Sequence, residues 1–563
     1  MKALEPFLYH TTVAYFSMEI ALRPDIHTYS GGLGVLAGDT ARSAADLNLP
    51  MVFVTLLSRE GYVRQELSAG GAQIDKPNPW TPTDSTHPLP AMVAISMEGR
   101  SVWIQPRLYR LACPIGHAVP VLLLDTDLDQ NAAEDRKITD RLYGGDDAYR
   151  LKQDIVLGIG GLLALRALGF SIRTYHLNEG HAALLALQLL RETRRPTDDL
   201  APGGSLYDRG VVREKCVFTT HTPVEAGFDK FDYALIDRVL GDYLEVDELK
   251  QLAGQDRLNM TQLALNLSGY VNGVARRHAE TTRKMFPGYQ IRSITNGVHA
   301  HTWTHRALAE LHVARFPHWA HEPELLAFAD QLADEDVWNA HQVAKSELVE
   351  HVRNATGTLM HADVPLIGLA RRMTAYKRPD LLFSDLERLM TIAQDQPFQV
   401  VLAGLAHPRD EPGHRLIESF HRHIERLAGV VPVAFLPGYD MKLGAAMVSG
   451  SDIWLNTPLP PLEASGTSGM KAALNGVLNF SVLDGWWIEG WVEGVTGWAI
   501  EGHPPGAGDA SALLDKLQSV VLPLYYNDRA RWIWMMKQSI SKIGATFNSQ
   551  RMMRRYATEA YMR

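Results

Sequence analysis

"PLIGLARRMTAYKRPDLLFSDLERLMTIAQDQPFQVVLAG", residues 365–404, is the stretch that decides the fold. It starts with a short apolar run at 365–370, continues through a helix-like segment at 379–395, and ends in a second apolar run at 399–404. Short apolar runs bounded by turn residues are typical of buried strands. A helix between two such strands is typical of a parallel sheet, so this stretch predicts strand, helix, strand.

The same alternation extends along the chain. Further strand-like runs occupy 51–57, 215–220, 431–436 and 452–456, and 179–195 is helix-like. With 563 residues the chain exceeds the size at which a single hydrophobic core stops growing. The sequence therefore predicts an α/β protein of two Rossmann-like, doubly wound domains that face each other across a central cleft. We expect the domains to cover 1–297 and 298–563, with a C-terminal helix that crosses back to the first.

Composition excludes several classes of protein. The net charge of −9 leaves no general basic field for nucleic acid or anionic lipid. Two cysteines, Cys113 and Cys216, exclude a disulfide framework and a cysteine-built zinc site, and no metal is expected. The longest apolar run, 155–165, is too short to span a bilayer, and the N-terminus lacks a signal-peptide pattern. We expect a cytoplasmic protein without nucleic-acid or membrane partners; a homo-oligomer stays open.

Glycine-bearing stretches occur at "YSGGLGVLAGD" (29–39) and "EASGTSGMKAALNG" (463–476). Gly31, Gly32 and Gly34 lack the dinucleotide spacing, and either stretch alone is more typical of a structural turn. The second reads as a tight turn that opens a short helix. Three roles are open to its Lys471: a surface charge, a phosphate contact, or an amine that bonds covalently to an aldehyde.

Four cations, Arg371, Arg372, Lys377 and Arg378, follow the predicted strand at 365–370. Such a concentration of charge favours phosphate or carboxylate partners, although a solvated helix start is an equal alternative. "SGMK" at 468–471 also fits the Ser-x-x-Lys signature of serine hydrolases, but the companion motifs are missing.

His181, in "HLNEGH", and His221, in "THTP", lie close to the ends of strand-like runs. A lone histidine is more often a hydrogen-bonded structural residue than a ligand. The position at the end of a predicted strand nevertheless keeps a sugar-binding role open for both.

Taken in order, these stretches resemble the α-glucan (glycogen, starch and maltodextrin) phosphorylases of the short prokaryotic type. The resemblance runs from "YFSMEIAL" (15–22) to "LDGWWIEG" (483–490), through "GGLGVLAGD", "RLKQD" (150–154), "HLNEGH", "THTP", "VNGVARRH" (271–278), "TNGV" (295–298), "RRMTAYKR" and "EASGTSGMKAALNG". It implies a GT-B architecture with pyridoxal 5'-phosphate held as an imine on Lys471. It also implies retaining phosphorolysis of the nonreducing end of an α-1,4-glucan or maltooligosaccharide by inorganic phosphate, to give glucose 1-phosphate.

The resemblance also implies roles for individual residues. The catalytic group is Lys471, Arg372, Lys377 and Glu463. The residues that match positions around the cofactor phosphate are Gly31, Gly32, Arg371, Lys377, Thr467 and Ser468. The residues that match the substrate site are Glu463, Ser465 and Gly466 at the sugar hydroxyls, His221 and Asn296 near its 6-hydroxyl, and Tyr376, Glu179 and His181 in the wall.

Three positions depart from the family pattern. Thr374 replaces a histidine and Asp440 a basic residue of the long animal and plant enzymes, and Leu405 replaces a common lysine. Two alternative functions are therefore kept. One is a nucleotide-sugar-dependent glucosyltransferase of the glycogen or starch synthase type, which shares the fold. The other is a degenerate glucan-binding protein on the phosphorylase scaffold.

Overall fold

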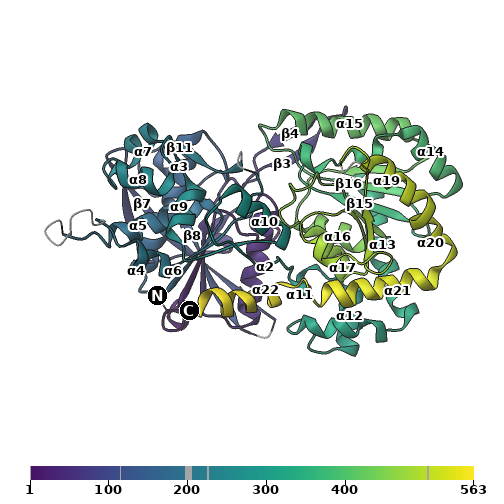
Figure 1. The fold of residues 1–563 in the computed structure, drawn as a ribbon, viewed down its shortest axis with the longest axis horizontal. Coiled ribbons are helices and arrows are strands. Elements are labelled where there is room, and N and C mark those ends of the chain that lie inside the picture. The colour runs from purple at the N-terminus through teal and green to yellow at the C-terminus, as the bar shows by residue number, and fades with distance from the viewer. Residues whose placement is uncertain (1, 115, 197–205, 225–226, 504–505, 563) are drawn as a thin grey trace.

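The computed structural model describes residues 2–114, 116–196, 206–224, 227–503 and 506–562. The described residues form a ten-stranded sheet, here called the first sheet, and a six-stranded second sheet. They occupy the left and right parts of Figure 1, each with helices packed around it. The expected α/β class with parallel sheets is confirmed.

The first sheet has the order β14-β13-β10-β9-β1-β2-β8-β7-β5, with β6 beside β7. All neighbours from β14 to β8 pair in parallel. Its strands are β1 (Val13–Ser17), β2 (Met51–Leu56), β5 (His87–Pro88), β6 (Val93–Met97), β7 (Arg100–Ala112), β8 (Ala118–Asp125), β9 (Thr174–Asn178), β10 (Cys216–Thr219), β13 (Tyr270–Gly273) and β14 (Arg292–Ser293).

One edge of the first sheet is antiparallel, which the sequence analysis does not anticipate. Strand β7 pairs antiparallel with β5, β6 and β8. The buried and exposed residues of β7 largely alternate, as expected of a strand with one face toward solvent. A strand of this kind contains no continuous apolar run, so that pattern does not predict it.

The second sheet is parallel throughout, with the order β17-β16-β15-β18-β19-β20. Its strands are β15 (Leu366–Ala370), β16 (Gln399–Ala403), β17 (Val433–Leu436), β18 (Ile453–Asn456), β19 (Leu478–Val482) and β20 (Gly497–Ile500). This is the doubly wound order, and the order reverses between β15 and β18, as it does between β1 and β9 in the first sheet. Ligands of open α/β sheets bind beyond the carboxyl ends of strands at such points.

Both sheets have a hydrophobic core on each face. Along β1, Ala14 and Phe16 belong to one core, whereas Val13 and Tyr15 belong to the other. In the second sheet, Ile367 and Leu369 of β15 contribute to one core, whereas Leu366 and Ala370 contribute to the core on the opposite face. Because neither face of these strands meets water, their sequences are continuous apolar runs.

Helices surround the two sheets. Those up to the end of the first sheet are α1 (Glu5–Leu8), α2 (Gly32–Asp46), α3 (Asp147–Ile155), α4 (Gly161–Ala167), α5 (Leu184–Arg191), α6 (Arg209–Lys215), α7 (Tyr233–Leu240), α8 (Val246–Ala253), α9 (Met260–Leu267) and α10 (Arg276–Met285). The later ones are α11 (Ala300–Trp303), α12 (Arg306–Arg315), α13 (Asp334–Thr356), α14 (Leu386–Asp395), α15 (Glu411–Leu427), α16 (Met441–Gly450), α17 (Ser468–Leu474), α18 (Trp487–Gly490), α19 (Asp509–Lys516), α20 (Leu522–Asn527), α21 (Arg529–Ser539) and α22 (Ser549–Tyr556). None of the described helices is both long and apolar enough to cross a membrane.

Two expected helices begin later than predicted. The helix expected over 379–395 starts at α14, because the Asp385 side chain accepts a hydrogen bond from Arg388 N at 3.0 Å and caps it there. The residues before it form a 3₁₀ turn, Leu381–Phe383. Likewise, α5 follows a 3₁₀ turn, Gly180–Ala182, so the helix expected over 179–195 is shorter at both ends.

The chain passes between the two sheets twice, and the two passages lie side by side. Val298 N donates to Phe547 O at 3.0 Å, and Ser549 N donates to Val298 O at 2.9 Å. Helix α21 runs along the second sheet, whereas α22 lies with the first (Figure 1). Ser549, at the start of α22, bonds Ser43 of α2 through their hydroxyls at 2.6 Å.

A hairpin forms another contact between the two halves of the molecule. Strands β3 (Arg64–Leu67) and β4 (Gln73–Lys76) reach from the first half toward the loops of the second (Figure 1). The buried amide of Gln65 donates to Gly404 O at 2.9 Å and accepts from Gly438 N at 3.0 Å. A second small hairpin consists of β11 (Lys230–Asp232) and β12 (Arg257–Asn259).

Candidate active site

A buried carboxylate after β1 holds the first glycine turn. Glu19 is 1% exposed, and its Oε2 accepts hydrogen bonds from Ser30 N at 2.6 Å and Gly31 N at 3.1 Å. Its Oε1 accepts from the Tyr143 hydroxyl at 3.0 Å. Glu19 was not among the predicted site residues, and the available signal was an acidic residue two positions after a fully buried strand.

Helix α2 begins at this turn with a free N-terminus. Gly31 is its N-cap, and no side chain of the described residues makes a capping bond to the first-turn N–H groups. A Cβ atom at Gly34 would lie 2.6 Å from Glu19 Oε2, and one at Gly38 would lie 2.1 Å from Ala21 O. These later glycines therefore allow close packing, whereas Gly31 and Gly32 form the turn.

Arg372 meets this turn from the other half of the molecule. A Cβ atom built on Gly31 would lie 3.1 Å from Arg372 Nη2. Arg372 follows β15 of the second sheet, whereas Gly31 precedes α2 on the first. A guanidinium thus lies beside the positive end of a helix dipole, an arrangement suited to an anion.

Arg371 spans the point where the strand order of the second sheet reverses. It donates through Nη1 to Lys377 O at 2.8 Å and through Nη2 to Asn456 Oδ1 at the end of β18. Its Nε is buried and has no partner among the described residues. Burial lowers the pKa of Arg371, against the attraction of Glu463.

The other two cations of the cluster serve different purposes. Lys377 forms an ion pair with Glu463, which joins the loop after β15 to the loop after β18. Arg378 donates to Pro458 O at 2.8 Å and to Asp509 Oδ2 at 2.6 Å, so it holds the backbone of the loop. Tyr376 lies beneath Lys377, with the ammonium 5.0 Å from the ring centroid.

Lys471 lies in α17 as a buried amine. Its Nζ is 3.7 Å from the centroid of the Trp303 ring, and among the described residues no carboxylate forms an ion pair with it. Burial lowers the pKa of Lys471 to about 8, although Asp39 attracts the charged form. At pH 7 about a tenth of this amine is unprotonated, far more than for a lysine of ordinary pKa, and the unprotonated form is the nucleophile.

The turn before Lys471 is fixed by its backbone conformation and by a hydrogen bond from its backbone. Gly466 has φ +76°, a conformation that favours glycine. The Asp484 carboxylate accepts from Glu463 N at 2.8 Å, and burial raises the pKa of Asp484 to about 6. The Ser465 hydroxyl is buried without a partner among the described residues, whereas Ser468 Oγ accepts from Trp454 Nε1 at 3.0 Å. Thr467 is the N-cap residue of α17, and its side chain makes no capping bond.

Glu179 and His221 come together at the ends of β9 and β10. Glu179 Oε2 accepts from His221 N at 2.7 Å and from the Thr222 hydroxyl at 3.0 Å. His221 Nε2 bonds Asn178 Oδ1 at 2.6 Å, and burial lowers the pKa of His221 to about 3. The imidazole is therefore neutral, and Glu179 positions the loop that carries it.

Within the described part of the chain, no hydrogen bond joins Asn296 or His181 to another predicted site residue. Asn296 Oδ1 and His181 Nδ1 are buried and unpaired among the described residues. His181 Nε2 lies 3.5 Å from Asp229 Oδ2. Buried polar atoms without partners are costly, so each is a candidate contact for a ligand.

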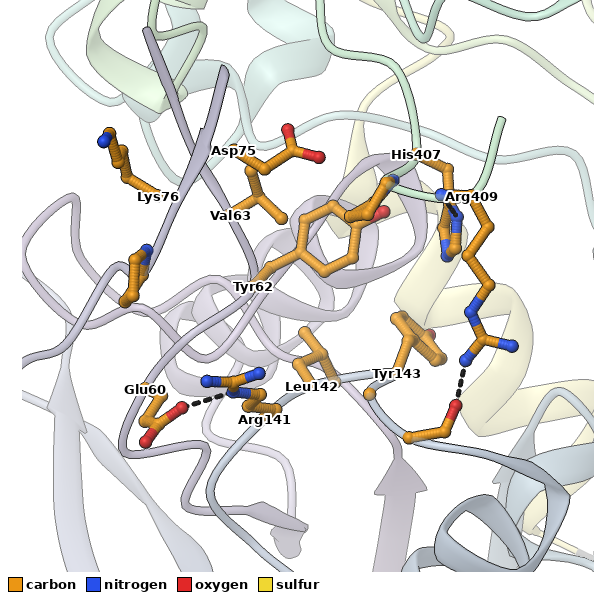
Figure 2. A pocket seen from close by; sticks show the side chains of 14 residues that line it. Glu60, Tyr62, Val63, Asp75, Lys76, Arg141, Leu142, Tyr143, His407 and Arg409 are labelled. Atoms are coloured by element: carbon orange, nitrogen blue, oxygen red, sulfur yellow. Dashed lines mark hydrogen bonds and ion pairs between the residues drawn. The ribbon is translucent and has the colours of Figure 1, made fainter. Parts of the chain in front are cut away.

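A cavity of about 400 Å³ lies between the two halves of the molecule (Figure 2). Tyr62, Tyr143, His407 and Arg409 lie along it, and Arg409 donates to the carbonyl of Gly145. Burial lowers the pKa of His407, and the charge of Arg372 lowers it further. Two lining residues connect the cavity to the site described above, since Tyr143 donates to Glu19 and His407 lies within the electrostatic influence of Arg372.

The three departures have plain structural settings. Asp440 caps α16, since its Oδ1 accepts from Leu443 N at 2.7 Å. Leu405 contributes its carbonyl, which accepts from Met373 N at 3.0 Å. The Thr374 hydroxyl is buried and unpaired among the described residues.

Several known proteins resemble this chain over most of its length. Residues 229–493 match the family model described as carbohydrate phosphorylase. The chain is 37% identical to a maltodextrin phosphorylase of Thermococcus litoralis, over 98% of this chain and 70% of the relative. It is 36% identical to a glycogen phosphorylase of Mycobacterium tuberculosis, over 98% and 71%. It is 34% identical to a glycogen phosphorylase of Aquifex aeolicus, over 98% and 86%. The chain belongs to the carbohydrate phosphorylase family.

Proposed function

We propose that this protein is an α-glucan phosphorylase. It transfers the glucosyl unit at the nonreducing end of an α-1,4-glucan to inorganic phosphate, with retention, and releases glucose 1-phosphate. The observation that carries the proposal is the meeting of Arg372 with the uncapped N-terminus of α2, since it creates an anion site between the two sheets. The named activities of the three relatives support the same reaction rather than nucleotide-sugar transfer.

Phosphorylases of this family generally use pyridoxal 5'-phosphate, and the residues present fit that group. Lys471 is a buried amine without an ion pair among the described residues, and Arg371 Nε is a buried donor without a partner. We assign Lys471 as the attachment point and Gly31, Gly32, Arg371, Lys377, Thr467 and Ser468 as the surroundings of the cofactor phosphate. When bound, the cofactor supplies a phosphate group that exchanges a proton with the substrate phosphate.

The cations of this chain make two neighbouring phosphates tolerable. Two dianions a few ångströms apart repel by several kcal/mol at the effective dielectric of a protein site, so cations must compensate them. In the proposed arrangement Arg372 binds the substrate phosphate, and Lys377 contacts both anions. Both residues lie in the segment that follows β15, and the Lys377 ammonium is held by its ion pair with Glu463 before the substrate arrives.

The sugar is positioned by the loop before Lys471 and by the ends of β9 and β10. Glu463, Ser465 and Gly466 orient its hydroxyls, and the free Ser465 hydroxyl is one available contact. Neutral His221 and the unpaired amide oxygen of Asn296 serve the 6-hydroxyl. Tyr376, Glu179 and His181 complete the wall of the site.

We also infer a GT-B arrangement in which residues 1–297 and 298–563 are the two Rossmann-like domains. The end of β14 at Ser293 and the start of α11 at Ala300 support a boundary near 297. Tyr556 of α22 is hydrogen-bonded to Thr219 of β10 at 3.1 Å and to Asn272 of β13 at 3.0 Å, which supports a C-terminal helix that crosses back. The cytoplasm is the proposed location, consistent with glucan and phosphate as substrates.

The test is phosphate-dependent release of glucose 1-phosphate from maltooligosaccharides of increasing length, with and without added pyridoxal 5'-phosphate. We expect release only with phosphate present, and more of it after the cofactor is added to depleted protein. Glucosyl transfer from a nucleotide sugar without phosphorolysis would favour the synthase alternative. Glucan binding without either reaction would favour the degenerate binding protein.

A further inference from the structure

A chain of contacts links α2 to Lys471 through the indole of Trp303. Lys471 Nζ lies 3.7 Å from the Trp303 ring centroid, and Trp303 Nε1 donates to Asp39 Oδ2 at 2.8 Å. Asp39 is 1% exposed. Because the indole nitrogen can only donate, this carboxylate determines how the ring that covers the amine is turned.

The Asp39 carboxylate is itself held firmly. Its Oδ2 also accepts from His299 N at 3.2 Å, and its Oδ1 lies 3.4 Å from Arg42 Nη1. Arg42 in turn donates to the carbonyls of Ala21 and Leu22, at 3.0 and 2.7 Å. A buried charge with several donors has a fixed position and loses little entropy when it orders a further group.

We propose that Asp39 is a positioning residue for Lys471, the proposed attachment point of the cofactor. Its carboxylate holds the Trp303 indole against the Lys471 amine and thereby connects α17 to α2. This inference rests on the proposed function, because it concerns the same site. Gly32 and Asp39 belong to one helix, about two turns and roughly 10 Å apart along its axis. Helix α2 thus places its N-terminus at the proposed phosphate site and Asp39, about two turns further on, at Trp303. The length of helix between these points sets the distance between the phosphate site and Lys471.

Helix α2 also offers a matched control. Asp46 is buried on the same helix, and its Oδ2 accepts from His299 Nε2 at 2.7 Å and from Gln550 Nε2 at 2.9 Å. Those contacts hold the two passages of the chain between the sheets. Neither Trp303 nor Lys471 is among the described hydrogen-bond partners of Asp46. A purely structural role would make the two aspartates behave alike.

The experiment is an absorbance titration of the full chain with pyridoxal 5'-phosphate, after bound cofactor has been removed. Wild type, Asp39→Asn, Trp303→Phe, the double variant and Asp46→Asn are compared, each with its melting temperature. We expect Asp39→Asn to weaken cofactor binding roughly tenfold, since a charge-assisted bond is lost. Asp46→Asn should lower the melting temperature and change the cofactor Kd by less than about twofold. The double variant should bind no more weakly than Trp303→Phe, because phenylalanine has no N–H to donate to Asp39 and the link from Asp39 to the ring is already broken.

Two results would overturn the inference: an unchanged Kd in Asp39→Asn, or independent, additive effects of Asp39→Asn and Trp303→Phe. If Asp39→Asn does not fold, Trp303→Phe decides the matter, and wild-type affinity in that variant is the overturning result. A wild-type chain that binds no pyridoxal 5'-phosphate would overturn the cofactor assignment in the proposed function itself. The titration therefore separates the failure of the inference from the failure of that assignment.

Discussion

Lys377 and Glu463 form an ion pair with each other between the loops that follow β15 and β18. Both side chains are mostly buried, at 16% and 12% exposure. In the proposed site the lysine faces phosphate and the glutamate faces sugar hydroxyls. The pair therefore fixes the relative position of the groups that hold the two reacting partners.

Glu463→Gln should lower kcat/KM for phosphorolysis by roughly tenfold or more. Glutamine keeps the size of the side chain but removes the charge that holds Lys377, and hydrogen bonds to charged groups contribute about 1.5–3 kcal/mol. Steady-state kinetics with varied phosphate and glucan measures the effect. Glu493→Gln, which breaks a pair with Lys516 away from the site, is the control and should keep wild-type kinetics.

Lys471→Ala and Lys471→Arg should both lose bound cofactor and reduce glucose 1-phosphate formation to background. Arginine retains a positive charge but cannot bond covalently to an aldehyde, so it separates attachment from charge. The near-ultraviolet absorbance of the purified variants and the phosphorolysis assay measure the two effects. Full phosphorolysis by either variant would show that the assigned attachment point is wrong.

Cofactor loading should respond to pH through the same amine. Because burial lowers the pKa of Lys471 to about 8, the unprotonated fraction rises about fivefold from pH 7 to pH 8, about twofold more by pH 9, and levels off above that. The rate at which depleted protein takes up pyridoxal 5'-phosphate should follow this curve between about pH 7 and about pH 10. A rate that still rises steeply at pH 10 would indicate a lysine with an ordinary pKa.

Arg372→Ala and Arg378→Ala should separate binding from stability. Arg372 faces the α2 N-terminus, so its loss should raise KM for phosphate by roughly tenfold to a hundredfold. Arg378 is paired with buried Asp509, so its loss should lower the free energy of unfolding by about 3 kcal/mol or more. Urea unfolding and phosphate kinetics on both variants measure the contrast, and equal effects on KM would contradict it.

Gly38→Ala should lower stability, whereas Gly32→Ala should weaken cofactor binding. A methyl group at Gly38 would meet the Ala21 carbonyl at 2.1 Å, so α2 must shift, and stability should fall by about 1–3 kcal/mol. At Gly32 no heavy atom lies within 4 Å of the added methyl group. That variant should keep its stability to within about 0.5 kcal/mol and bind the cofactor more weakly, since the open space belongs to the proposed phosphate site.

The amino-acid sequence by itself determined the parallel sheets and where the motifs lie on them. Strands buried on both faces must be apolar throughout, so runs such as 51–57 and 399–404 can be recognised as strands from the sequence. The cation cluster was likewise visible as the continuation of 365–370. The antiparallel edge at β7 was missed because a half-exposed strand leaves a weaker pattern.

Only the tertiary structure decided which side chains of these motifs act together. Arg372 and Arg378 belong to one charged stretch, yet one faces Gly31 and the other holds Asp509. Asp39 meets Trp303 only because two sheets, far apart along the chain, pack around α2. Local patterns reflect burial and helix or strand period, which depend on near neighbours, whereas these contacts depend on how the sheets dock, which no local pattern encodes.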